Sequence, residues 1–411
     1  MQGDEQARLT ADAVARRSYG KLVAFLAART RDVAAAEDAL SEAFASALAD
    51  WPVNGCPGNP EGWLLTVARR KTIDFARRRQ THESAALDLQ LLTLNAVADA
   101  AEIPDERLAL MFACAHPAID AGIRAPLILQ VLLGLDAAMI ASAFLLSPAA
   151  MSQRLVRAKE KIRQAGIPLQ VPGREDLAGR LETVLNALYA AFAEGWTDPA
   201  GTDAARRDLS EEALFLGRLV AELLPEEPEA LGLLALMLHA EARRPARRSA
   251  AGDYVPLAEQ EPSLWDTQMI EAAEGLLLRA SALGAIGRYQ LEAALQSAHV
   301  HRRRTGVANW GEVVQLYDAL LDSSGSPVVA INRALAICEQ RGAADGLEAM
   351  PDAASDPRLN EYQPYWAARA QLLAKCGAHA EARDAYDIAI GLERDPAVRR
   401  FLQQRQASLG P

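Results

Sequence analysis

The chain has 411 residues, of which 50% are hydrophobic and 5% aromatic, and its net charge at pH 7 is -11. This length suits two to four domains with their own cores, and the composition excludes a largely disordered protein. No apolar run approaches the roughly 18 residues of a membrane span, and the N-terminus lacks a signal-peptide core. Because the four cysteines are scattered, we expect a soluble cytoplasmic protein with neither a disulfide framework nor a zinc site.

Alanine and leucine dominate the sequence, and long strand-like alternations are hard to find, which predicts an all-α fold. The charge is unevenly distributed. Residues 1–170 hold 19 Lys and Arg against 19 Asp and Glu, so the whole net negative charge lies in residues 171–411. We therefore expect any contact with nucleic acid in the N-terminal part.

The first segment, from about residue 12 to residue 80, has the pattern of several helices. Turn-forming residues at 51–60 predict a loop within it. The helix expected after this loop carries an apolar stripe flanked by a basic cluster at residues 69–79, and a second basic cluster lies at residues 154–163. Two such clusters, about one small domain apart in an acidic chain, indicate two separate contacts with one polyanion, of which DNA is the first to consider.

Residues 134–163 have the pattern of two short helices joined by a tight turn. Asp136 is placed to cap the first helix, and Ser147 followed by Pro148 is a strong start signal for the second. The second helix is rich in Arg and Gln, as in the recognition helix of a helix-turn-helix motif. An ordinary helical hairpin with a solvated charged end is the alternative for this segment taken alone.

Together these segments resemble regions 2 and 4 of an extracytoplasmic-function (ECF) sigma factor of the sigma-70 superfamily. The region 2 pattern is matched from Pro60 to Arg78, and the region 4 pattern from Ser147 to Lys159. Residues 36–44 resemble the polymerase-binding helix of the family, although Ser41 replaces its usual Gln. Met139 stands where the family often has an acidic residue.

The resemblance implies roles for individual residues. Contacts with the promoter −10 element and its opening strand would come from Asn59, Arg69, Arg70, Lys71, Arg77 and Arg78. Recognition of the −35 element would come from Ser152, Gln153, Arg154, Arg157, Lys159 and Lys161. Core polymerase would be bound by Asp38, Glu42 and Phe44. The loop at residues 53–60 would form part of a pocket for a flipped base. Phe44 fits a core position equally well, and any single cation also fits a solvated face.

Pro168, Pro172 and Gly173 mark a boundary, beyond which the pattern is helical to the C-terminus. Small residues and Tyr386 between residues 373 and 392 fit the second half of a tetratricopeptide repeat (TPR). This region resembles the extension of an ECF subgroup with a TPR-like C-terminal domain, which implies a protein partner there, such as a DGPF (YCII-related) protein. A helical bundle without a ligand is the alternative. The expected domains are region 2 at 10–82, a linker at 83–104, region 4 at 105–168 and the extension at 172–411.

The resulting hypothesis is an ECF sigma factor that binds core RNA polymerase and promoter DNA, regulated by its C-terminal domain. The extension could inhibit the factor or be required for its activity, and the subgroup resemblance favours the second. The competing hypothesis is a stand-alone helix-turn-helix regulator with a helical ligand- or protein-binding domain. No motif of an enzyme, cofactor or metal site is recognisable, since His299 and His301 lack a third ligand nearby.

Overall fold

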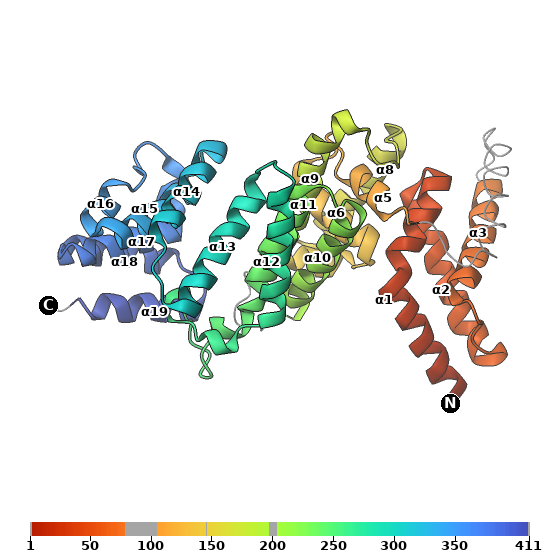
Figure 1. The fold of residues 1–411 in the computed structure, drawn as a ribbon. Coiled ribbons are helices and arrows are strands. Elements are labelled where there is room, and N and C mark those ends of the chain that lie inside the picture. Colours follow the sequence, from red (N-terminus) through yellow and green to blue (C-terminus); the bar gives the residue numbers. More distant parts are fainter. Residues whose placement is uncertain (1, 79–104, 145, 197–203, 410–411) are drawn as a thin grey trace. The chain divides into compact units, whose positions relative to one another are not determined.

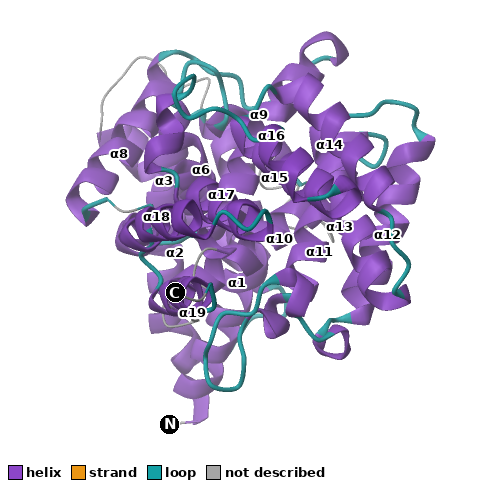
Figure 2. Cartoon of the chain, turned by 90° about the vertical axis from the view of Figure 1, so that its left-hand side faces the viewer, coloured by secondary structure: helices purple, strands orange, loops and turns teal. Residues whose placement is uncertain are grey.

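The computed structural model describes residues 2–78, 105–144, 146–196 and 204–409 (Figure 1, Figure 2). Within these ranges every regular element is a helix, apart from an isolated β-bridge between Arg248 and Tyr254. The expected all-α fold is therefore confirmed. The expected linker at 83–104 lies outside the described residues.

Residue contacts divide the chain into two compact units, one that extends to Leu216 and one that begins at Gly217. The helices of the N-terminal unit are α1 (Gln2–Thr30), α2 (Val33–Asn54), α3 (Pro60–Arg78), α5 (Arg107–Cys114), α6 (Ala121–Leu133), α7 (Ala137–Ala143), α8 (Pro148–Gln164) and α9 (Arg174–Trp196). Helix α10 (Ala204–Leu223) crosses the division.

Helices α1, α2 and α3 pack against one another. Their core includes the fully buried side chains of Leu22, Phe25, Leu26, Leu40, Trp51 and Leu64. Asp32 caps the start of α2 by accepting a hydrogen bond from the Ala35 N–H at 3.0 Å. Ser18 on α1 donates to Glu61 Oε1 at 2.5 Å, which fixes the first turn of α3 on α1.

The loop expected at residues 51–60 is partly wrong, because α2 continues to Asn54. Pro52 lies inside this last turn, where its ring removes one backbone hydrogen bond. Burial of the large Trp51 side chain, which is 1% exposed, outweighs that loss. The helix ends where Gly55, with φ of 85°, donates its N–H to the Trp51 carbonyl.

Helices α5 to α8 form the second part of the N-terminal unit. Asp120 caps α6 through the Gly122 N–H at 3.0 Å, and Gly134 ends it in the left-handed region with φ of 69°. Helix α9 packs on α5 and α6, where Arg180 donates to the Phe112 carbonyl at 3.0 Å. The division that the contacts define, between Leu216 and Gly217, thus lies beyond α9 and therefore after the boundary expected at 168–172.

The C-terminal unit begins within α10 and continues as a succession of helices (Figure 1). Its α-helices are α11 (Pro228–Ala242), α12 (Thr267–Ala282), α13 (Arg288–Thr305), α14 (Trp310–Ser324), α15 (Pro327–Arg341), α16 (Ala343–Glu348), α17 (Gln363–Lys375), α18 (His379–Leu392) and α19 (Pro396–Ala407). Its 3₁₀ turns are η1 (Arg244–Arg247), η2 (Leu257–Glu259), η3 (Pro262–Leu264) and η4 (Pro357–Glu361).

Helices α17 and α18 form a hairpin that turns at Gly377, whose φ of 79° favours glycine. The small side chains of Ala382 and Ala389 and the ring of Tyr386 are buried in one cluster beside this turn. The helical hairpin predicted from this pattern is confirmed, whereas the assignment to a TPR stays a prediction.

Helix α11 is buried on all sides, from Ala230 to Ala240. Even so, neither it nor any other described helix has both the length and the hydropathy that crossing a membrane requires. It carries the buried His239, and the buried Arg243 follows as its C-cap residue. Arg243 donates to the His239 carbonyl at 3.1 Å and to Gln296 on α13.

His239 makes the stability of the C-terminal unit sensitive to acid. Burial, and secondarily the charge of Arg243, lower its pKa from 6.5 to about 4. Glu274 Oε1 lies 3.5 Å from His239 Nε2, but the Glu274 side chain is 43% exposed, so water screens that attraction. Between these two pKa values the unfolded chain binds the proton and the folded chain does not, so stability falls as the pH falls.

We expect the free energy of unfolding to fall by up to about 3 kcal/mol, through the lowered pKa of His239, as the pH falls from about 7 to about 4. Urea denaturation of wild type and His239→Leu at each pH measures this loss, which the variant should lack. His301→Gln, at an exposed position of α13, is the control and should behave as wild type. Equal pH slopes for His239→Leu and wild type would contradict the assignment.

Candidate nucleic-acid interface

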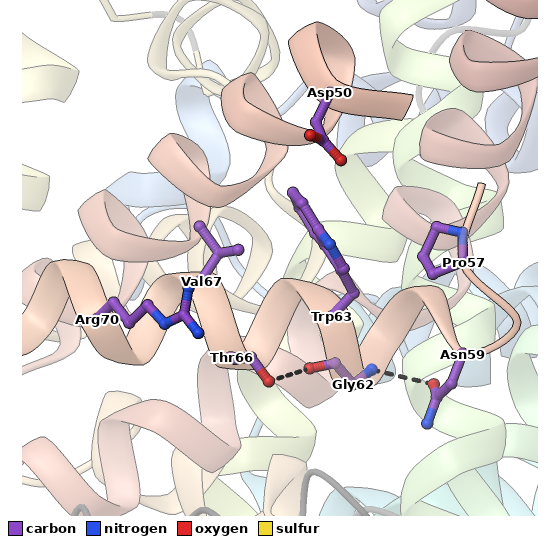
Figure 3. Close-up of a pocket in the computed structure, with 8 residues that line it drawn as sticks. All are labelled: Asp50, Pro57, Asn59, Gly62, Trp63, Thr66, Val67 and Arg70. Atoms are coloured by element: carbon purple, nitrogen blue, oxygen red, sulfur yellow. Dashed lines mark hydrogen bonds between the residues drawn. The ribbon is translucent and has the colours of Figure 1, made fainter. Parts of the chain in front are cut away.

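The loop before α3 and the first turns of that helix border a surface pocket of about 570 Å³ (Figure 3). Asn59 caps α3, because its Oδ1 accepts a hydrogen bond from the Gly62 N–H at 3.0 Å. The pocket is lined by Asp50, Pro57, Asn59, Gly62, Trp63, Thr66, Val67 and Arg70. Two predicted contact residues, Asn59 and Arg70, therefore lie in one pocket.

The walls of this pocket are held in place by α2. The ring of Trp63 meets that of buried Trp51 edge-on, with 5.5 Å between centroids. Asp50 accepts a hydrogen bond from the Asn54 amide at 2.7 Å. An aromatic ring, a carboxylate, an amide and a guanidinium thus surround one cavity, which suits the face and polar edges of an unstacked base.

The predicted cations of α3 differ in their surroundings. Arg70 is exposed and Arg69 is half-buried. Lys71 pairs with Glu42 of α2, with 2.8 Å between Nζ and Oε2. The side chains of Arg77 and Arg78 lie outside the described part of the structure, and their roles stay predictions.

Helix α2 carries the three residues predicted to contact polymerase. Asp38 is exposed, Phe44 is partly buried, and Glu42 is held by Lys71. Because α2 packs directly on α3, the ion pair joins the predicted polymerase-binding helix to the predicted promoter-opening helix. Since the pair is about 40% exposed on both sides, a competing anion can reach the Lys71 amine.

Helices α7 and α8 have the local structure that the sequence predicts. Asp136 caps α7 through the Met139 N–H at 2.7 Å, and Ser147 caps α8 through the Ala150 N–H at 3.3 Å. One face of α8 is buried through Met151, Leu155, Ala158 and Ile162. The opposite face exposes Ser152, Gln153, Arg154, Arg157 and Lys161.

Lys159 lies on neither the exposed face of α8 nor its apolar face. Its Nζ is 2.7 Å from Glu37 Oε2 on α2 and donates to Gln130 Oε1 on α6 at 2.9 Å. The side chains of Lys159 and Glu37 are 13% and 11% exposed. Among the six residues predicted to read the −35 element, Lys159 is thus the one whose amine is held inside the N-terminal unit.

A second pocket, of about 490 Å³, lies between the start of α6 and the exposed face of α8. Three predicted DNA-contacting cations, Arg154, Arg157 and Lys161, line it together with Asp120. Asp120 is engaged as the cap of α6. The net positive lining suits a phosphate group beside α8, the predicted recognition helix.

Sequence reasoning missed several residues of these sites. Asp50, Trp63, Thr66 and Val67 line the first pocket, although Trp63 belongs to the motif matched from Pro60. Burial of Trp51 was the missing signal, because it extends α2 and brings Asp50 to the pocket. The partnership of Glu37 with Lys159 joins residues 122 positions apart, so no local pattern could indicate it.

Comparison with known proteins finds family matches for two segments of the chain. A family model described as Sigma-70 region 2 matches residues 14–82, and a family of unknown function (DUF6596) matches residues 180–281. An uncharacterized protein of Rhizobium meliloti (strain 1021) is 37% identical over 383 residues, which cover 91% of this chain and 90% of that protein. No solved structure matches the chain.

Two substitutions at Asn59 separate its cap from its place in the pocket. Asn59→Asp keeps the capping acceptor, so its unfolding free energy should equal that of wild type, whereas Asn59→Ala should lose about 1 kcal/mol. Asn59→Asp should nevertheless impair promoter opening more than Asn59→Ala does, because the new carboxylate repels DNA phosphates. Thermal unfolding and open-complex formation with core polymerase measure the two effects. If Asn59→Asp opens the promoter as wild type does, Asn59 acts only as the cap of α3 and has no role in the pocket.

Proposed function

We propose that the chain, of which residues 14–82 match sigma-70 region 2, is an ECF-type sigma factor of the sigma-70 family. In this role it binds core RNA polymerase and directs initiation at promoters with −10 and −35 elements. The observation that carries the proposal is the pocket at the start of α3, where Asn59, Trp63 and Arg70 converge beside a basic helix face. The polymerase supplies the catalysis, so the chain itself acts as a non-enzymatic factor in the cytoplasm.

At the −10 element, the pocket receives a base that has left the stack. Trp63 offers a flat apolar surface, while Asp50, Asn59 and Arg70 offer acceptors and donors for the base edge. Arg69, Lys71, Arg77 and Arg78 follow along α3 and attract the opened strand. Binding the flipped base only in the open form favours strand separation, because the duplex offers no such base.

At the −35 element, α8 enters the major groove with its exposed face. Ser152, Gln153, Arg154 and Arg157 lie at or near its N-terminal half, where side chains of a recognition helix reach base edges. Arg is suited to guanine and Gln to adenine. Lys161, further along the helix, meets phosphates.

The polymerase contact is made by α2. Asp38 is exposed and Glu42 half exposed, so this helix offers carboxylates to a partner. Phe44 adds a partly buried ring beside them. Association with polymerase beside α3 places the pocket where the strands separate.

The C-terminal unit regulates the factor through a TPR-like surface. Its α17–α18 hairpin has the small-residue packing of such repeats, and stacked helical pairs present binding surfaces. We infer a protein partner for this surface, such as a DGPF (YCII-related) protein. The extension is required for activity in this proposal.

In-vitro transcription from a library of promoter fragments, with purified core polymerase, tests the proposed function. Transcripts that appear only when the chain is added support an ECF sigma factor and reveal its promoter. The competing stand-alone regulator predicts specific duplex binding without polymerase, and no added transcripts. That second result, together with no association with core polymerase, would overturn the proposal.

Arg157→Ala and Lys161→Ala should separate base reading from phosphate contact on α8. We expect Arg157→Ala to lower transcription from the preferred promoter roughly tenfold and to relax its −35 preference, as loss of about 1–3 kcal/mol implies. Lys161→Ala should weaken all promoters alike and reduce the salt dependence of binding by about one counterion. Identical promoter profiles for the two variants would contradict these roles.

Removal of the C-terminal unit tests its role in regulation. A chain that ends after α10 retains α9 on α5 and α6, so the N-terminal unit keeps its packing. We expect this truncation to lose promoter-dependent transcription while circular dichroism shows a folded protein. A gain in transcription would instead make the extension an inhibitor.

A further inference from the structure

The C-terminal ends of α11 and α13 lie side by side in the C-terminal unit, where Ala242 and Val300 share one buried cluster. Arg243 follows α11 as its C-cap residue, and Arg302 lies in the last turn of α13. The charges of both arginines act on one imidazole, that of His299. Two cations and a histidine therefore gather within residues 171–411, the part of the chain that carries its net negative charge.

Arg243 is only 8% exposed, yet its hydrogen-bond partners are neutral groups. Its Nε donates to the His239 carbonyl at 3.1 Å, and its Nη2 donates to Gln296 Oε1. Burial, and secondarily the charge of Arg247, lower its pKa from 12.5 to about 10. The end of a helix offers roughly half an elementary negative charge, so much of this buried positive charge stays unbalanced by the part of the chain that the structure describes.

Arg302 is partly buried and likewise donates to neutral groups. Its guanidinium lies 3.7 Å from the centroid of the Trp310 ring and donates to Asn309 Oδ1 at 3.1 Å. A second N–H donates to His299 Nδ1 at 2.8 Å, so that imidazole carries its own proton on Nε2. Burial, with the charges of Arg302 and Arg243, lowers the pKa of His299 to about 4, which makes the ring neutral at pH 7.

Two carboxylates near this cluster have partners of their own. Glu339 acts on Arg302 through its charge, but its Oε1 pairs with Lys375 Nζ at 2.5 Å. Glu274 accepts a hydrogen bond from the Ser297 hydroxyl at 2.9 Å. The cluster formed by Arg243, His299 and Arg302 therefore keeps an excess of positive charge.

We propose that the C-terminal unit binds a small phosphate-bearing molecule at this arginine cluster. A phosphate monoester has a charge of about −1.5 to −2 at pH 7, which matches two guanidinium groups beside a neutral imidazole. A guanidinium has more N–H donors than Asn309 and His299 use, so Arg302 can also donate to a phosphate oxygen.

The phosphate reaches the cluster from the side of His299, Arg302 and Trp310, which are partly exposed. The depth of Arg243 suits one compact anion better than an extended acidic segment. This site goes beyond the proposed promoter function, since it gives the C-terminal unit a ligand of its own.

Isothermal titration calorimetry of the full-length chain tests this site with inorganic phosphate and with glycerol 3-phosphate. Sodium chloride at equal ionic strength is the blank. We expect saturable binding of at least one probe to wild type, and affinity roughly tenfold weaker or less for Arg302→Met, because a charged hydrogen bond is lost. Arg304→Met is the matched control, since Arg304 is exposed on the same helix and donates to Thr267. The absence of saturable binding, or equal losses in the two variants, would overturn the proposal.

The emission of Trp310 gives a second measurement that does not depend on the folding of Arg302→Met. Because Arg302 lies over the Trp310 ring, bound phosphate should change the fluorescence of wild type and of Trp366→Phe, but not that of Trp310→Phe. An unchanged emission of wild type, or the same change in Trp310→Phe, would contradict the site. Neither measurement uses polymerase or promoter DNA, so failure of this site and failure of the proposed function are told apart.

Discussion

The packing of α6 and α8 on α1 and α2 is the constraint on which the N-terminal unit depends. Gly20 lets two helix backbones meet, and the buried pair of Glu37 and Lys159 satisfies the charges that this approach encloses. A charge left alone in such a place would cost several kcal/mol, so each partner requires the other. Two elements with separate proposed roles in DNA binding are therefore joined by buried contacts within the N-terminal unit.

The pocket before α3 depends on packing in the same way. Trp51 is buried beneath the last turn of α2 and supports the edge of Trp63, which forms the aromatic wall. Asp50 reaches the pocket because that last turn stays helical. The Glu42–Lys71 pair then links this pocket to the face of α2 proposed to bind polymerase. A change in α2 on polymerase binding would thus alter the pocket proposed to hold the flipped base.

The sequence predicted the local features and missed those that need distant partners. Asp136 and Ser147 cap the helices that they were expected to cap, because a cap depends on residues two or three positions away. Lys159 has the spacing of a surface cation, and only the fold shows that Glu37 holds it. Pro52 predicted a loop, yet tertiary burial of Trp51 overrides that signal. The position of α9 likewise follows from Arg180 and Phe112, which lie 68 residues apart.

The distance between α1 and α8 during promoter binding tests the central claim most directly. Spin labels at Ala13 and Gln164, both exposed, report this distance in the full-length chain after removal of the accessible thiols Cys56 and Cys376. Pulsed electron paramagnetic resonance should give one distance within the ~45 Å width of the unit for the free protein. Bound to core polymerase and promoter, the labels should move apart, because the proposed −10 and −35 elements lie about 25 base pairs apart, or ~85 Å along B-form DNA. An unchanged short distance in that complex would contradict the proposed reading of two promoter elements by one chain.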